Sequence, residues 1–409
     1  MSRWTRAAVA SVWALLGCVG GGESADTAVA EPDADSCAPA PSADQRAQYS
    51  ELRHAVGFSL SYEDGHTVIT THPPVDQGGG EDVVVLVSCG HAAPPLSGRL
   101  AGAHVIERPI RTVAANEDLS LTRMRVLGLR DRVIGVGSRG IFDDGLRALF
   151  DSGAAAEIGA SFHGPPRFET LLSIDPDVTF LSTASLTDAT SLDRTRELGL
   201  AAVPAVSWVE PTLLGQGEWL HYVAALMGAE DIARPHFDEV EARYLELATR
   251  AARADRAPLV LWIDPSGAGD RWVVPSNSWK ARAIQDAGGR VAFARSDGPT
   301  TVEATSEEIL ELGDSIFAVV TESIALNEPG STGALEGLPA VVEGRLFSVH
   351  RRALPEYDAY DWYESAVVEV DKVLEDFVAL LHPDLVPGHI PHHLIPARTG
   401  SEPARAPRP

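Results

Sequence analysis

The sequence predicts an α/β protein of two Rossmann-like lobes joined by a single long helix. Short β-rich runs alternate with helical patterns in two series, one before residue 229 and one after Pro258, and this alternation is typical of parallel sheets covered by helices. One helical pattern, residues 229–254, separates the series. A helix-then-strand segment, RFETLLSIDPDVTFLS (167–182), is matched in the second series by TSEEILELGDSIFAVV (305–320). We therefore expect one equivalent unit in each lobe.

The composition indicates a sizeable core and more than one domain. The chain has 409 residues, of which 44% are hydrophobic, and domains commonly hold about 100–200 residues. It has 33 basic and 58 acidic residues and a net charge of -25, so a polyanionic nucleic acid is not an expected partner. Its 3 cysteines lack the C-x-x-C spacing of zinc and redox sites.

The N-terminus predicts an export signal, residues 1–17, that ends at a lipidated cysteine. Arg3 and Arg6 precede an apolar run over residues 7–17, which is too short to span about 30 Å of hydrocarbon. The ending LLGC resembles the bacterial lipoprotein processing site, at which Cys18 would receive diacylglycerol. An ordinary secretory signal or a buried apolar segment is the alternative. We expect an exported, lipid-anchored protein on the periplasmic side of a bacterial membrane.

Residues 18–45 predict a disordered tether between the anchor and the folded body. The segment consists mainly of Gly, Ala, Ser, Pro and Asp, so burial cannot offset the entropy that ordering would cost. Export would place Cys37 and Cys89 in an oxidising compartment. The sequence leaves open whether these two cysteines form a disulfide or stay free.

The folded body begins with a hairpin and then divides around one helix. GFSLSYEDGHTVITTH (57–72) alternates apolar and polar residues around an Asp-Gly turn. The expected parts are an N-terminal lobe over 46–228, a connecting helix over 229–255, a C-terminal lobe over 256–388 and a tail over 389–409. Pro235 is expected to limit where the regular part of the helix begins.

Motifs in both series carry a resemblance to a known family. In order they are IERPIRTVAA, LGLRDRVIGVGSR, FETLLSIDPDVTFLS, PTLLGQGEWLHYVAALMG, RWVVPSNSWKARAIQDAGG, LEGLPAVVEGRLFSV and DWYESAVVEVDKVLEDFVALLHPDLVPGH. From about Phe58 to about His389 the chain resembles the substrate-binding lipoproteins of bacterial importers for iron complexes, haem and cobalamin. The resemblance implies the class III periplasmic-binding-protein fold and a monomer without enzymatic activity or an intrinsic cofactor. The implied partners are an ABC permease with its ATPase subunits, and a ferric siderophore, haem or corrinoid as ligand.

The resemblance also implies a role for the repeated unit. In the family, a glutamate on the outer surface of each lobe docks onto arginines of the permease, and Glu169 and Glu307 stand at the two matching positions. A plain structural role is the alternative, because the helix dipole favours glutamate in a first turn. Thr305 and Glu308 have capping-box spacing, which accounts for Glu308 and leaves Glu307 free.

The candidates for ligand contact are aromatic and arginine residues in or beside predicted loops, because a flat chelate or macrocycle needs aromatic walls and charge partners. They are Arg139, Trp208, Trp272, Trp279, Arg351, Arg352, Tyr357 and Tyr360. Of these residues, Trp272 and Arg139 are the favoured candidates for ligand contact. For each tryptophan, packing in the core is the alternative. A phenolate of Tyr357 or Tyr360 bound to iron would favour haem or bare ferric ion.

The remaining motifs receive a non-catalytic interpretation. GVGSRG (135–140) fits a dinucleotide-binding fingerprint, but its helix pattern starts too late, so a strand-end loop facing the cleft is preferred. His389, His392 and His393 lack a carboxylate or cysteine framework and are expected to be solvated tail residues without a metal. Neither H-E-x-x-H nor G-x-S-x-G occurs. A zinc or manganese receptor and an exported enzyme are the rival functions.

Overall fold

The computed structural model describes residues 41–72, 80–183, 186–267, 270–327 and 332–397, which all belong to one compact unit. The predicted signal peptide, Cys18 and Cys37 lie outside the described residues. The first described helix, α1 (Ala43–Ser50), starts within the expected tether, because Ser42 and Gln45 form a capping box at its N-terminus. In the described part of the chain, no helix has the length and apolar character needed to cross a membrane.

A four-stranded sheet confirms the predicted hairpin. Its strands are β1 (Phe58–Tyr62), β2 (His66–Thr71), β3 (Asp82–Val87) and β4 (His104–Glu107). β1 and β2 pair antiparallel around a turn in which Gly65 has a φ of 80°, a conformation that glycine adopts without steric cost. β2 pairs antiparallel with β3, and β3 pairs parallel with β4.

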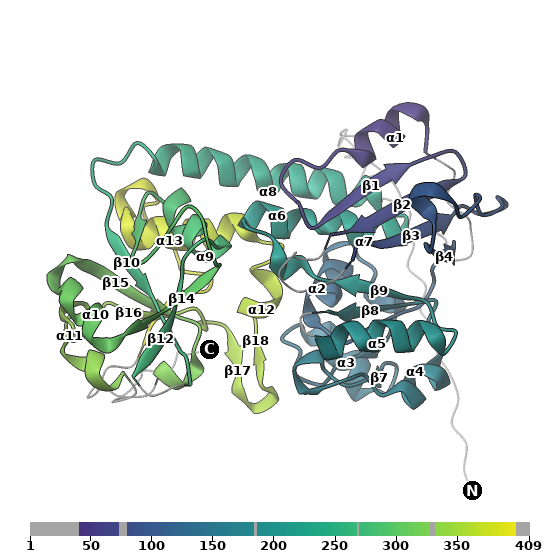
Figure 1. Cartoon of the computed structure of the whole chain (residues 1–409). Coiled ribbons are helices and arrows are strands. Elements are labelled where there is room, and N and C mark those ends of the chain that lie inside the picture. Colours follow the sequence, from purple (N-terminus) through teal and green to yellow (C-terminus); the bar gives the residue numbers. More distant parts are fainter. Residues whose placement is uncertain (1–40, 73–79, 184–185, 268–269, 328–331, 398–409) are drawn as a thin grey trace, which may run out of the picture. The chain divides into compact units, whose positions relative to one another are not determined.

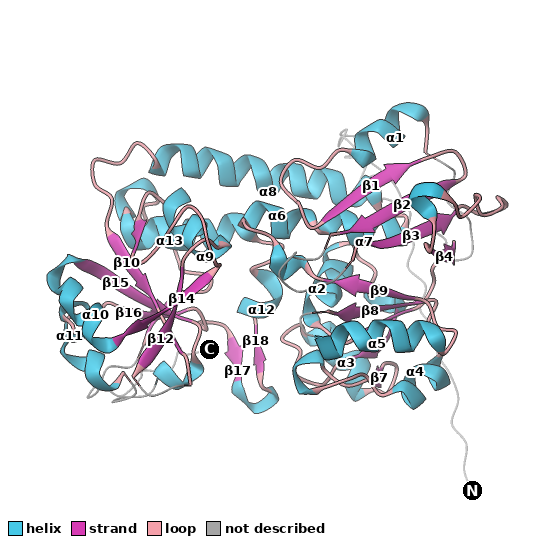
Figure 2. Ribbon diagram, in the orientation of Figure 1, coloured by secondary structure: helices cyan, strands magenta, loops and turns pink. Residues whose placement is uncertain are grey.

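The N-terminal lobe contains a parallel five-stranded sheet (Figures 1 and 2). Its spatial order is β7 (Ala156–Glu157), β6 (Val133–Val136), β5 (Val113–Ala115), β8 (Val178–Ser182) and β9 (Ala202–Ala205). Every residue of β8 and β9 is buried, as expected for strands that helices cover on both faces. The helices of this lobe are α2 (Asp118–Val126), α3 (Asp144–Asp151), α4 (Phe168–Ile174), α5 (Leu186–Glu197), α6 (Leu213–Glu218) and α7 (Leu220–Met227).

One long helix, α8 (Glu230–Ala251), follows the N-terminal lobe, as the helical pattern predicted. Its buried residues at three-to-four spacing include Phe237, Val240, Tyr244 and Leu247. The helix contacts α7 of the N-terminal lobe and α13 (Val370–Leu381) of the C-terminal lobe (Figure 1). Pro235 lies inside the helix, so it does not set the start that the sequence suggested.

The C-terminal lobe repeats this architecture around a second five-stranded sheet (Figure 2). Its spatial order is β13 (Arg290–Val291), β10 (Leu259–Trp262), β15 (Ile316–Thr321), β16 (Leu346–Ser348) and β19 (Ile395–Pro396), with only β19 antiparallel. Two smaller sheets comprise β11 (Asp264–Pro265), β12 (Arg271–Pro275) and β14 (Thr301–Thr305), and the hairpin β17 (Ala353–Leu354) and β18 (Ala359–Tyr360). The other helices are α9 (Trp279–Asp286), α10 (Ser306–Leu312), α11 (Pro339–Val342) and α12 (Trp362–Ser365).

The structure confirms the internal repeat. α4 leads into β8 and α10 leads into β15, and these two strands lie beside β5 and β10, which come first in their own sheets. Leu171 and Ile309, which match in the sequence, are both fully buried. Glu169 and Glu307, which also match, are both exposed. The two lobes therefore present equivalent helix starts to solvent.

The segment after residue 388 corrects the predicted tail. The side chains of His389 and His393 are only 5% and 1% exposed, and β19 adds a strand to the main sheet. The cause is Asp376 on α13, whose carboxylate accepts the backbone N–H groups of three consecutive residues, His392 to Leu394. A buried carboxylate that satisfies several backbone donors can fix a segment with few apolar residues.

Candidate functional site

A cavity of about 370 Å³ lies where the two lobes meet. The N-terminal lobe lines it with Arg125, Phe142, Asp143, Asp144 and Arg147, and the C-terminal lobe with Arg352, Leu354, Asp361, Glu364, Ser365 and Glu369. Several of these residues lie on loops that follow β6 and β16. Ligands of α/β sheets bind at this carboxyl edge, and the size suits a small-molecule site.

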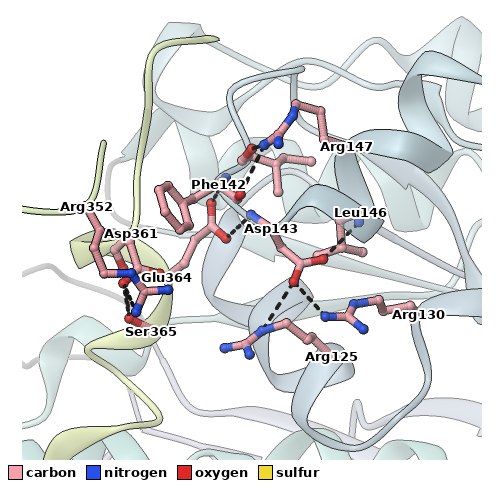
Figure 3. A network of polar contacts seen from close by, with 11 residues as sticks. Arg125, Arg130, Phe142, Asp143, Leu146, Arg147, Arg352, Asp361, Glu364 and Ser365 are labelled. Atoms are coloured by element: carbon pink, nitrogen blue, oxygen red, sulfur yellow. Dashed lines mark hydrogen bonds and ion pairs between the residues drawn. The ribbon is translucent and has the colours of Figure 1, made fainter. Parts of the chain in front are cut away.

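Glu364 on α12 joins the two lobes (Figure 3). Its carboxylate accepts a hydrogen bond from the backbone N–H of Asp143 at 3.0 Å and another from the N–H of Phe142. These donors stand just before α3, where the free N–H groups and the helix dipole favour a negative charge. Because Glu364 is only 3% exposed, water competes little for these bonds. Glu364 thus holds the start of α3 against α12.

Asp143 caps α3 and neutralises two arginines (Figure 3). Its carboxylate accepts the N–H of Leu146 at 2.9 Å, which is the usual N-capping bond. A guanidinium nitrogen of Arg130 lies 2.6 Å from the same carboxylate, and one of Arg125 lies 3.7 Å from it. Arg125 therefore faces the cavity with its charge partly balanced.

Arg352 and Asp361 form an ion pair on the C-terminal wall, with 3.0 Å between nitrogen and oxygen. The same carboxylate accepts the hydroxyl of Ser365 at 2.6 Å. The guanidinium of Arg352 also lies 5.2 Å from the ring centre of Phe142, a cation–π distance. Because the side chain of Arg352 is 44% exposed, it is accessible to a ligand while it keeps these contacts.

Carboxylates dominate the electrostatics of the cavity. The acidic residues Asp143, Asp144, Asp361, Glu364 and Glu369 outnumber the arginines Arg125, Arg147 and Arg352. Burial, followed by the charges of Asp361 and Asp143, raises the pKa of Glu364 to about 7. Burial, together with the charges of Glu364 and Glu117, also raises the pKa of Asp118. The charge of this wall therefore changes near neutral pH.

The hairpin of β17 and β18 brings Tyr357 to the N-terminal lobe. The guanidinium carbons of Arg139 and Arg147 lie 4.6 and 4.7 Å from the centre of the Tyr357 ring. A Cβ on Gly140 would lie 3.3 Å from the carbonyl oxygens of Tyr357 and Asp358, so the backbones pass closely here. The GVGSRG motif is therefore a strand-end loop that faces the other lobe, as predicted.

Of the predicted ligand-contact residues, Arg352 lines the cavity and the others do not. Arg139 is paired with Asp151 at 2.7 Å, and Arg351 is exposed. Trp272 requires a correction, because it is only 8% exposed and belongs to the core of the C-terminal lobe. Its indole N–H donates a hydrogen bond to the hydroxyl of Ser306 at 2.9 Å. This bond satisfies the polar atom of Trp272 inside the protein, so no ligand is needed to do so.

The remaining aromatic candidates lie in or beside clusters outside the cavity wall. Trp279 is half-buried, and its ring centre lies 6.1 Å from that of Trp362. Tyr360 is half-buried and lies 5.0 Å from the imidazole of His350. Trp208 follows β9, and its buried indole N–H has no hydrogen-bond partner among the described residues.

Most residues of the polar wall have no distinctive functional signal in the sequence. Asp361 and Glu364 lie in the motif DWYES, where polar residues flank the aromatic pair Trp362 and Tyr363. Asp143 and Arg147 lie in the helical pattern IFDDGLRALF, whose aspartates indicated a capped helix start. Both signals were present, but neither could indicate that the two segments meet.

The role of Glu169 and Glu307 in docking to the permease remains a prediction. Within the described residues, neither carboxylate takes part in a hydrogen bond or an ion pair. Glu308, by contrast, completes the predicted capping box with Thr305.

Cys89 forms a disulfide bond, whereas Cys37, its predicted partner, lies outside the described residues.

Comparison with known sequences finds similarity to one protein family. A sequence model described as periplasmic binding protein matches residues 151–352. Two uncharacterized lipoproteins of Methanocaldococcus jannaschii are 24% identical over 254 residues and 31% identical over 84 residues. These matches cover 59% and 20% of this chain. The matched region spans 56% of the length of the first relative and 21% of the second.

Solved structures share the fold. A periplasmic haem-binding protein of Pseudomonas aeruginosa has a TM-score of 0.53 at 16% identity, with 72% of this chain and 100% of that chain covered. A possible iron-binding periplasmic solute-binding protein of Staphylococcus epidermidis has a TM-score of 0.52 at 11% identity, with 67% and 100% covered. The predicted fold class is confirmed. Residues 151–352 are thus similar in sequence to periplasmic binding proteins, and the chain shares the two-lobe α/β fold of the solved periplasmic proteins.

Proposed function

We propose that this protein is the extracytoplasmic substrate-binding lipoprotein of an ABC importer, and that it captures a metal complex between its lobes. The ligand class comprises ferric siderophores, haem and corrinoids. The observation that carries the proposal is the cavity, whose wall combines Arg352 and Glu364 of one lobe with Asp143 and Arg147 of the other. Fold relatives described as haem-binding and possible iron-binding proteins support this class.

The charges of the wall narrow the ligand class. Because acids outnumber arginines in the wall, a strongly anionic complex would meet repulsion at neutral pH. The wall suits a ligand of low or positive net charge that offers hydrogen-bond donors and acceptors at its edge. A corrinoid with its amide edge, or a neutral or cationic ferric siderophore, meets this requirement best.

One separate observation favours haem as a second candidate. Tyr363 is 42% exposed, and its ring centre lies 5.5 Å from that of His350 and 6.4 Å from that of Tyr360. A tyrosine phenolate can ligate haem iron. Burial, with the charge of Glu322, raises the pKa of Tyr363, so its phenolate would form only against the positive charge of the iron.

The two repeated helix starts are proposed as the permease-docking sites. Each carries an exposed glutamate and, three residues later, an exposed leucine: Leu172 is 47% exposed and Leu310 is 40% exposed. A helix dipole accounts for a glutamate in a first turn, but it gives no reason for an exposed leucine at the same offset in both lobes. A charged residue beside an apolar one is a composition that suits a protein interface.

A binding panel tests the ligand class. The purified protein would be titrated with cobalamin, haem, neutral and anionic ferric siderophores, and zinc, and followed by absorption spectroscopy and calorimetry. We expect saturable 1:1 binding of a metal complex. Tight binding of zinc with no affinity for any complex would instead support the metal-ion receptor, and turnover of a ligand would support an enzyme.

A matched pair of variants tests the site. Arg352→Ala removes a cavity arginine, and Arg167→Ala removes an arginine that is 56% exposed and paired with Glu157 outside the cavity. Loss of a charge-assisted contact costs about 1.5–3 kcal/mol, so Arg352→Ala should weaken binding at least about tenfold. Arg167→Ala should leave the affinity unchanged. Equal effects of the two variants would place the ligand elsewhere.

A further inference from the structure

The C-terminal segment contains a cluster of metal-ligand side chains that the proposed function does not use. Glu375 lies on α13, and His389 and His392 lie on the segment that follows η10 (Pro383–Leu385). One ligand atom from each residue lies within 4.8 Å of those of the other two. We infer that Glu375, His389 and His392 form a binding site for a divalent transition-metal ion such as Zn²⁺, which fastens the C-terminal segment to α13.

A second carboxylate orients the buried histidine of this site. Nε2 of His389 lies 2.6 Å from Oδ1 of Asp376, and the two side chains are only 5% and 1% exposed. If Nε2 donates its proton to Asp376, the lone pair of Nδ1 is left to face Glu375, 3.4 Å away. A carboxylate bonded to the far nitrogen of an imidazole is the arrangement that fixes zinc-binding histidines.

The spacing of the three donors agrees with a tetrahedral ion. Zinc bonds of about 2.0–2.1 Å require donors that lie roughly 3.3 Å apart. The Nδ1 of His389 and the carboxylate of Glu375 are 3.4 Å apart, and Nε2 of His392 and the same carboxylate are 4.0 Å apart. His392 and Glu375 are 32% and 39% exposed, so a small side-chain rotation can close the longer gap. Two imidazoles and one carboxylate then leave one coordination position for water.

The backbone that carries the histidines is held independently of a metal. The N–H of His392 donates to Asp376 at 2.8 Å, and the N–H of His389 donates to the carbonyl of Val386 at 3.2 Å. Pro391 lies between the two histidines and restricts the backbone further. The donors are therefore brought together before an ion binds, which lowers the ordering cost of binding.

This site is separate from the cavity between the lobes, because none of its three ligands lines that cavity. The ion would be a structural component, and the proposed transported complex would not pass through it. The net charge of the chain, -25, favours a cation at any suitable site. The inference departs from the expectation that these histidines bind no metal.

Zinc binding by a tag-free full chain tests the inference. The protein, stripped with a chelator, would be titrated with Zn²⁺ by calorimetry, and its thermal unfolding would be followed with and without Zn²⁺. The ligand variant combines Glu375→Gln with His392→Ala, two partly exposed positions whose change should not prevent folding. The control variant combines His72→Ala with Glu81→Gln, which removes a single histidine–glutamate pair at 3.1 Å in the other lobe.

We expect one zinc ion per chain for the wild type and for the control variant. The ligand variant should lose about 100-fold or more in affinity, because even outer-shell changes cost about 10–100-fold. Zinc should raise the unfolding temperature of the wild type and not that of the ligand variant. Absence of 1:1 zinc binding in the wild type would overturn the inference. Equal zinc binding by the ligand variant would also overturn it.

Discussion

The carboxylate of Glu364 should make the stability of the protein fall as the pH rises through neutrality. Its pKa is about 7 in the folded protein, against an ordinary value of 4.5, so the folded state binds this proton more tightly than the unfolded state does. The stabilisation from the proton is complete below the unfolded pKa and is lost as the pH rises through the folded pKa.

The two pKa values set the size of the effect. A folded pKa of about 7 and an unfolded pKa of 4.5 correspond to a loss of about 2.5 kcal/mol in the free energy of unfolding between pH 5 and pH 8. The variant Glu364→Gln cannot ionise, so it should lack this loss, and the absent charge should also relieve the raised pKa of Asp118. Its absolute stability at low pH can be lower, because an amide nitrogen would face a backbone N–H. The informative quantity is therefore the difference in pH dependence between the two proteins.

Urea unfolding at several pH values measures this difference. We expect the wild type to lose about 2–3 kcal/mol relative to Glu364→Gln between pH 5 and pH 8. The exposed Glu311, changed to Gln, serves as a control and should follow the wild type. If the curves for the wild type and Glu364→Gln run parallel, the carboxylate does not titrate in this range and the argument from its burial is refuted.

Three further predictions concern the anchor, the docking surface and the connecting helix. Cys18→Ser should leave an unprocessed precursor that fatty-acid labelling does not mark, and equal labelling of this variant would remove the lipoprotein assignment. Glu169→Ala combined with Glu307→Ala should preserve ligand binding but reduce stimulation of the permease ATPase in liposomes by about tenfold or more. The exposed pair Glu197→Ala and Glu311→Ala should have no effect, and an equal effect of both pairs would indicate a non-specific loss of charge. Ligand binding should change the radius of gyration only slightly in small-angle scattering, because α8 connects the lobes and contains no glycine; a contraction typical of wide hinge closure would contradict this.

The fold could be predicted where local patterns determine it. The hairpin around Gly65 has a turn signal between two alternating runs, and the residues of α8 repeat with helical spacing. The repeated helix-then-strand unit was predictable because Leu171 and Ile309 occupy the same buried position in each lobe. These features depend on residues that are close together in the sequence.

The site could not be predicted because it depends on contacts between distant segments. Glu364 acquires its role only from the N–H groups before α3 in the other lobe. Trp272 was expected at the cleft, but the pairing of β12 turns it toward the core. The histidine segment was expected to be solvated because its few apolar residues give no sign of the buried Asp376 that holds it.

An anomalous difference map tests most directly whether the two lobes hold a metal complex between them. Crystals grown with the best-binding iron or cobalt complex would be measured at the absorption edge of that metal. We predict one strong peak inside or at the mouth of the cavity lined by Arg125, Arg352 and Glu364. A peak on the outer surface of either lobe, with the cavity unchanged, would contradict the account.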